Sequence, residues 1–155
     1  MQKITTFLWF NDKAEEAMNF YVSTFKNSKV VNISRNGEGG PGPKGSVLLV
    51  TFELDGQRFQ ALNGGPMFSF TPAISLFVNC ETQPEVDELW DKLSEGGSKD
   101  RCGWLKDRYG LSWQIVPSAL GELMKDPQKA PRVMQALMKM DKLDIAGLKQ
   151  AAEGK

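Results

Sequence analysis

The chain has 155 residues, a formal net charge of zero, 41% hydrophobic and 25% charged residues, and no histidine. This length suits one domain, which can bury a core without a disulfide or a structural metal. Balanced charge argues against a nucleic-acid or anionic-membrane partner, and the lack of histidine excludes histidine-based triads and histidine-ligated metal sites.

The sequence also indicates a cytoplasmic protein. No window approaches the roughly 20 apolar residues of a membrane span, and the N-terminal apolar stretch is too short for a signal peptide. The two cysteines, Cys80 and Cys102, form no CxxC pair. We expect reduced thiols in place of a disulfide or a zinc site.

The first half of the chain predicts a strand, a helix and three further strands. The strands are expected at 4–10, 29–35, 47–54 and 58–62. Asp12, with Glu15 three residues later, is typical of a capped helix start, and the apolar spacing continues to about residue 26. A Gly/Pro loop at 36–46 and an Asp55-Gly56 hairpin turn connect the later strands.

The second half repeats this order. Strands are expected at 73–79, 98–102, 104–106 and 111–116, with a helix that starts at Thr82 and ends before Gly96-Gly97. Leu8-Trp9-Phe10-Asn11 resembles Leu76-Phe77-Val78-Asn79, and the stretch 56–62 resembles 110–116, with an aromatic before a glutamine in both. We interpret this as the duplication of one βαβββ unit.

Residues 119–155 predict three short helices. Their methionine-rich stripe, which includes Met134 and Met138, either packs on its own domain or forms a surface for a partner.

Several long strings identify a family resemblance. AEEAMNFY, AISLFVNCETQPEVDELWDKL, CGWLKDRYGLSWQIVP and RVMQALMKM closely resemble the PhnB-like branch of the vicinal oxygen chelate superfamily, which includes glyoxalases, bleomycin-resistance proteins and extradiol dioxygenases. Proteins of this branch are often described as 3-demethylubiquinone-9 3-methyltransferases. The resemblance implies one α+β domain over 1–155 and a homodimer. Its two βαβββ modules, 1–66 and 72–118, would form a half-barrel cup, followed by a helical tail at 119–155.

Enzymes of the superfamily hold a divalent metal in the cup through His, Glu or Gln on the first and last strands of each module. The matching last-strand residues are Gln60 and Gln114, and the first-strand residue of module two is near Ser75. Its counterpart in module one is Phe7 by internal alignment, or Thr5 or Thr6 by spacing. None of these is His or Glu, so we expect no metal and no cofactor.

One motif points to nucleotides but fails in context. Residues 37–42 match GxGxxG, yet a strand and not a helix follows them, so we expect a connecting loop. A Rossmann-type methyltransferase would need a glycine-rich loop between an early strand and helix, and none is present.

These residues support three hypotheses. The first is a metal-independent protein that binds a small molecule through Trp9, Gln60, Ser75, Trp113 and Gln114. The second is a metal-dependent lyase, dioxygenase or thiol transferase whose ion is held by Gln60, Gln114 and either water or substrate oxygens. The third is an interaction protein that uses the C-terminal helices. The residues do not decide whether the protein is an enzyme.

Overall fold

A computed structural model describes residues 2–155. The fold divides into two compact units, the first ending at Phe70 and the second beginning at Thr71. Each unit is built around its own open, four-stranded sheet.

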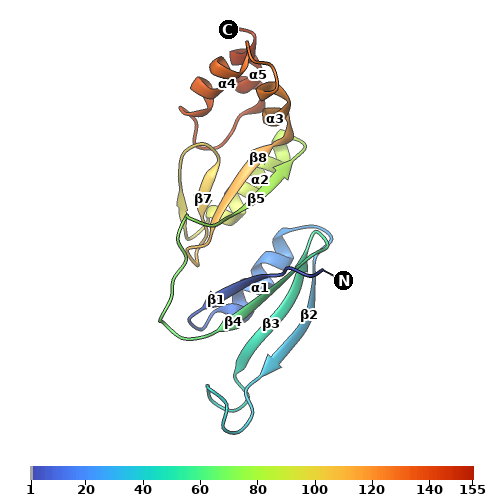
Figure 1. Ribbon diagram of the computed structural model, residues 1–155, viewed down its shortest axis with the longest axis vertical. Helices are drawn as coiled ribbons and strands as arrows, with labels where there is room; N and C mark the ends of the chain where they lie inside the picture. The colour runs from blue at the N-terminus through green and yellow to red at the C-terminus, as the bar shows by residue number, and fades with distance from the viewer. Residues whose placement is uncertain (1) are drawn as a thin grey trace. The chain divides into compact units, whose positions relative to one another are not determined.

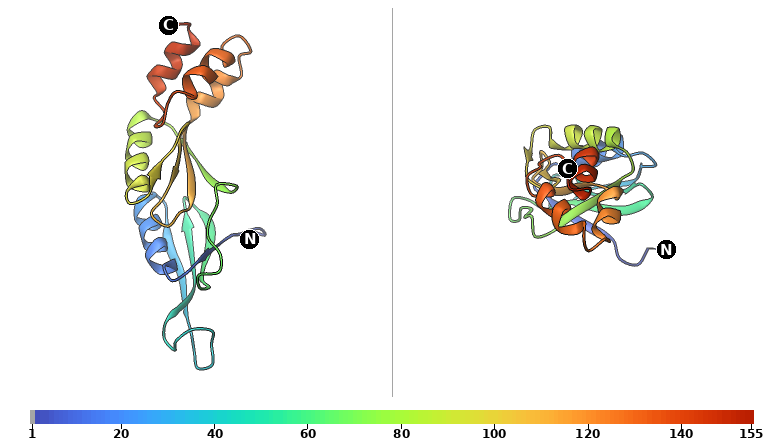
Figure 2. Two further views of the ribbon diagram at one scale, coloured as in Figure 1. Left: turned by 90° about the vertical axis from the view of Figure 1, so that its left-hand side faces the viewer. Right: turned by 90° about the horizontal axis from the view of Figure 1, so that it is seen from above.

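The first unit contains five elements: β1 (Thr6–Phe10), α1 (Ala14–Thr24), β2 (Lys29–Arg35), β3 (Val47–Leu54) and β4 (Gln57–Asn63). The sheet order is β1-β4-β3-β2, with β1 parallel to β4 and the other pairs antiparallel. Helix α1 covers one face of this sheet (Figures 1 and 2).

The second unit repeats the same order with β5 (Ser75–Cys80), α2 (Gln83–Ser94), β6 (Ser98–Lys99), β7 (Trp104–Lys106) and β8 (Ser112–Pro117). Its sheet order is β5-β8-β7-β6, and β5 runs parallel to β8 (Figure 1). Both sheets therefore have the order first, fourth, third, second. This confirms the predicted α+β class and the duplicated βαβββ unit.

The sheet register corrects the internal alignment. Gln60 lies beside Phe7 on β1, and Gln114 lies beside Phe77 on β5. Phe7 is therefore equivalent to Phe77, and the expected match of Trp9 to Phe77 was wrong by two residues. A shift of two keeps every side chain on the same face, so the hydrophobic pattern could not reveal it. Counting back two residues from each phenylalanine pairs Thr5 with Ser75.

The core of the first unit lies between α1 and its sheet. Tyr21 and Met18 of the helix are buried against strand residues that include Phe52 and Phe59, whose rings stack 5.6 Å apart. Asp12 does not cap this helix as predicted, since the N-cap residue is Lys13, without a side-chain bond. Instead the amide of Ala14 donates to Asn63 Oδ1 at 2.8 Å, so a residue from the end of β4 fixes the start of α1.

The core of the second unit contains the buried face of α2. Leu89, Trp90 and Leu93 pack on the side of the sheet that carries Leu105 and Trp113. The predicted N-cap is confirmed, because the amide of Glu85 donates to Thr82 Oγ1 at 3.3 Å.

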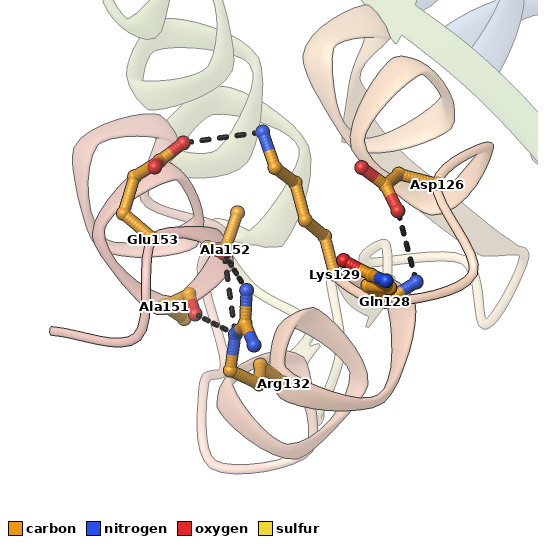
Figure 3. A network of polar contacts seen from close by, with 7 residues as sticks. All are labelled: Asp126, Gln128, Lys129, Arg132, Ala151, Ala152 and Glu153. Carbon is orange, nitrogen blue, oxygen red and sulfur yellow. Dashed lines mark hydrogen bonds and ion pairs between the residues drawn. The ribbon is translucent and has the colours of Figure 1, made fainter.

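The C-terminal tail belongs to the second unit. It forms α3 (Ser118–Met124), α4 (Ala130–Leu137) and α5 (Ile145–Ala152) around buried Val133, Leu148 and Ala152. In this tail Arg132 donates to the carbonyls of Ala151 and Ala152, and Lys129 pairs with Glu153 (Figure 3). These bonds close the C-terminal end of α5, where carbonyls lack helical partners.

The tail is also tied to the rest of its unit. The side chain of Gln83 on α2 accepts from the Ile145 amide at 2.8 Å and donates to the Leu143 carbonyl at 3.0 Å. Met134 and Met138 remain 40% and 59% exposed, so the methionine-rich stripe is only partly packed. Among residues 2–155, no helix is both long and apolar enough to cross a membrane.

Candidate functional site

The face of the first sheet opposite α1 carries aromatic and amide side chains. In each sheet, we call the face that is not covered by the helix α1 or α2 the open face. Leu8 and Phe10 are buried toward the helix, so Phe7 and Trp9 lie on the opposite face. Gln60 is half-buried on that face, between Phe7 of β1 and Thr51 of β3. Phe7 is 52% exposed, which is high for a phenylalanine on a regular strand.

The corresponding face of the second sheet repeats this arrangement. Gln114 lies between Phe77 of β5 and Trp104 of β7, and Phe77 is 53% exposed. The Gln114 amide nitrogen donates to Ser75 Oγ at 2.9 Å. The structure therefore brings together two of the predicted site residues, Ser75 and Gln114.

Trp113 does not lie on the same face as Ser75 and Gln114. Adjacent residues of a strand point to opposite faces, and Trp113 is on the α2 side, only 2% exposed. Its indole N–H donates to Asp107 Oδ2 at 2.9 Å, while Asp107 Oδ1 accepts from the amides of Tyr109 and Leu111. Asp107 is the buried acceptor that organises the β7–β8 turn.

Trp9 is held in one place by its neighbours. Its indole N–H donates to the Gly65 carbonyl at 2.9 Å, and its ring meets Phe68 edge-on at 4.9 Å. A Cβ at Gly64 would lie 2.4 Å from the indole, so this position requires glycine. The indole is therefore pre-positioned on the open face.

A cavity of about 630 Å³ adjoins Trp9 at the end of the first sheet. Its lining includes Asp12, Glu15, Asn36 and Asn63. Asn36 is 7% exposed and shapes the glycine-rich loop, accepting from the Gly45 amide at 2.7 Å and donating from its backbone to the Ser46 carbonyl at 2.8 Å. Sequence reasoning missed Asn36, although asparagine at the start of a Gly/Pro loop is a known turn signal.

The cysteines do not form a reactive pair. Cys80 is fully buried at the end of β5, and burial, followed by the nearby Glu85 and Glu81 carboxylates, raises its pKa to about 12. At neutral pH its thiol is therefore protonated and a poor nucleophile. Cys102 has φ of 63° beside Gly103, and their two amides donate to the carbonyls of Met140 and Asp141. Both cysteines are free, as expected.

The residues at the metal-ligand positions that the family resemblance implies do not suit a divalent ion. By the sheet register these positions are Thr5, Gln60, Ser75 and Gln114, which offer only neutral oxygens. The Ser75 hydroxyl also already accepts from Gln114. Across residues 2–155, no group of three or more carboxylates or thiols is placed to hold an ion. Hard divalent cations prefer charged oxygen donors or imidazole, so this set does not fit one.

A family profile and solved structures of other proteins match this chain. The 3-demethylubiquinone-9 3-methyltransferase family profile matches residues 2–116. A putative PhnB protein of this description from Bacillus cereus is 47% identical, with a TM-score of 0.71, and the match covers 76% of this chain and 100% of that one. No curated protein matches the chain.

More distant structures share the fold alone. A Pseudomonas aeruginosa protein is 20% identical over 76% of this chain and 98% of its own, with a TM-score of 0.63. The fosfomycin resistance protein FosX from Listeria monocytogenes, solved with Mn(II) and sulfate, is 15% identical over 81% of this chain and 98% of its own, with a TM-score of 0.55. This chain therefore belongs to the 3-demethylubiquinone-9 3-methyltransferase family, and its fold is similar to that of the PhnB protein.

Proposed function

We propose that this protein binds a small organic molecule against the open faces of its sheets, without a metal. The observation that carries the proposal is the repeated pair of an exposed phenylalanine and a neighbouring glutamine: Phe7 with Gln60, and Phe77 with Gln114. A half-exposed phenyl ring on a regular strand leaves apolar surface in water, and ligand contact would remove it.

The chemistry of these side chains favours an organic ligand over an ion. Each glutamine offers one acceptor and two donors, which suits carbonyl, hydroxyl or amine groups. The aromatic rings supply flat apolar contact, and on the first sheet Trp9 adds a ring that is already fixed by its bond to Gly65. The residues proposed in this way are Trp9 and Gln60 on the first sheet, with Phe7 added, and Ser75 and Gln114 on the second sheet, with Phe77 added. Trp113 supports the second sheet from its buried side.

Methyl transfer is not part of the proposal, although the family description names it. A nucleotide cofactor in a Rossmann-type site rests on a glycine-rich turn between a strand and a helix. Here the β1–α1 connection is Asn11-Asp12-Lys13 and the β5–α2 connection is Glu81-Thr82, neither of which contains glycine.

We also propose a cytoplasmic homodimer, based on the superfamily resemblance. Light scattering of the purified chain would give twice the 17.2 kDa chain mass. A mass of one chain at micromolar concentration would refute the dimer.

Ligand retention tests the binding proposal. The purified protein is equilibrated with a cell extract, separated from free metabolites, and measured by native mass spectrometry. We expect retained small molecules on the wild type and their loss in the Gln60→Ala/Gln114→Ala double variant. Gln135→Ala, an exposed glutamine on α4, is the matched control and should retain them. Equal retention by the double variant would refute the proposed site.

A further inference from the structure

A row of side chains crosses the open face of the second sheet, one from each strand. Ser75 of β5 pairs with Ser112 of β8, Ser112 with Lys106 of β7, and Lys106 with Ser98 of β6. Paired residues of adjacent strands lie on the same face, so the row places one lysine among three hydroxyls. Gln114 and Phe77 form the next row along the same face.

The ammonium of Lys106 has no counter-charge. Within residues 2–155 no ion pair or side-chain hydrogen bond involves Lys106, and the residue is half-buried. Asp100, the acid that follows β6, is exposed and forms no ion pair with Lys106 among the described residues. An uncompensated, partly desolvated ammonium attracts an anion.

The duplicated module provides an internal comparison. In the first sheet the equivalent row contains Arg58 of β4, Glu53 of β3 and Lys29 of β2. There Glu53 takes the place of Lys106, and it pairs with Arg58 at 3.4 Å. The row of module one is thus internally compensated, whereas the row of module two is not.

A second observation comes from Ser112, in the middle of the row. Ser112 is only 1% exposed, and its hydroxyl has no hydrogen-bond partner in the described structure. A buried hydroxyl without a partner is unfavourable, so such a group calls for an explanation such as a bound molecule. A ligand oxygen that reaches the row would supply the missing acceptor.

We infer that the second module binds an organic anion. The ligand has an aromatic or apolar body that lies on Phe77 and Trp104, and it carries a carboxylate, sulfonate or phosphate that pairs with Lys106 beside the serine row. This inference rests on the proposed function and adds the charge class of its ligand. Lys106 is the residue that sets this class, and Gln114 is placed to bind a further polar group.

Two fluorescent probes with nearly the same rings test whether the second module binds an organic anion. One is 8-anilinonaphthalene-1-sulfonate, which is anionic, and the other is N-phenyl-1-naphthylamine, which lacks the sulfonate. Loss of one charge-assisted hydrogen bond corresponds to about a tenfold change in Kd. We therefore expect Lys106→Met to weaken sulfonate binding by about tenfold and to leave the uncharged probe within about twofold. Lys106→Arg, which keeps the charge, should bind both probes like the wild type.

Lys99→Met is the matched control. Lys99 is the β6 lysine that pairs with Leu105 and so lies toward the opposite face, and its loss should change neither Kd. Phe77→Ala should weaken both probes because it removes the shared apolar contact.

The outcomes separate the two proposals. If Phe77→Ala weakens both probes but Lys106→Met leaves sulfonate binding unchanged, the anion inference is wrong and the open-face site stands. If neither variant changes either Kd, both proposals fail. Circular dichroism of each variant confirms that the fold is retained.

Discussion

The buried carboxylate of Asp107 should be a major source of stability in the second unit. It accepts hydrogen bonds from the Tyr109 amide at 2.8 Å, the Leu111 amide at 3.1 Å and the Trp113 indole at 2.9 Å, and the residue is 2% exposed. Asp107→Ala would leave two of these donors, those of Leu111 and Trp113, buried without an acceptor. At about 1–3 kcal/mol for each unsatisfied donor, we expect a loss of about 3 kcal/mol in the free energy of unfolding.

Urea denaturation followed by tryptophan fluorescence measures this loss, since Trp113 is itself one of the partners. With a slope of about 2 kcal/mol per molar urea, the midpoint should fall by about 1.5 M. The exposed Asp91 on α2 is the matched control, and Asp91→Ala should shift the midpoint by less than about 0.3 M. A shift for Asp107→Ala as small as that of the control would refute the assigned role of this carboxylate.

Four further predictions concern the thiols and the helix caps. In native protein at pH 8, iodoacetamide should modify Cys102 and spare Cys80, and equal labelling by peptide mass mapping would contradict the burial of Cys80. Folding raises the Cys80 pKa to about 12, so between about pH 9 and pH 12 the thiol loses its proton in the unfolded chain but keeps it in the folded one. The free energy of unfolding should therefore fall as the pH rises through this range, and it should fall less steeply in Cys80→Ala. Asn63→Ala should lower the free energy of unfolding by about 1 kcal/mol, because α1 loses its cap. Gln83→Ala should lower it by about 1–2 kcal/mol, because the bonds to the tail are lost. Urea denaturation measures both, and unchanged midpoints would refute these two contacts.

Local signals in the sequence predicted the local structure well. The Thr82 cap depends on a residue three positions away, and the structure confirms it. The Asp55-Gly56 turn and the duplicated strand order likewise follow from neighbouring residues and a repeated pattern. These features require only short-range chemistry, which a single sequence contains.

The failures involve partners that are distant in the chain. Asn63, 49 residues away, accepts the capping bond at the start of α1, and Gln83, 62 residues away, accepts a bond from the first amide of α5. No local pattern distinguishes these side chains from any other polar residue. The nearby acid at Asp12 was therefore the natural but wrong choice for the first cap.

The candidate site shows a limit of a different kind. Trp113 and Gln114 are neighbours on one strand, so strand alternation alone indicates that they cannot line the same face. That signal was present in the sequence. The compensated and uncompensated rows around Glu53 and Lys106 were not visible in it, because they depend on the register of four strands.

Calorimetric titration of Mg²⁺, Mn²⁺, Fe²⁺, Ni²⁺ and Zn²⁺ into metal-stripped protein tests the central claim of metal-independent binding most directly. The neutral oxygens of Thr5, Gln60, Ser75 and Gln114 predict no stoichiometric binding at micromolar metal. One ion bound tightly per chain, and lost in Gln60→Ala and Gln114→Ala but not in Gln135→Ala, would contradict the account and favour a metal-dependent enzyme.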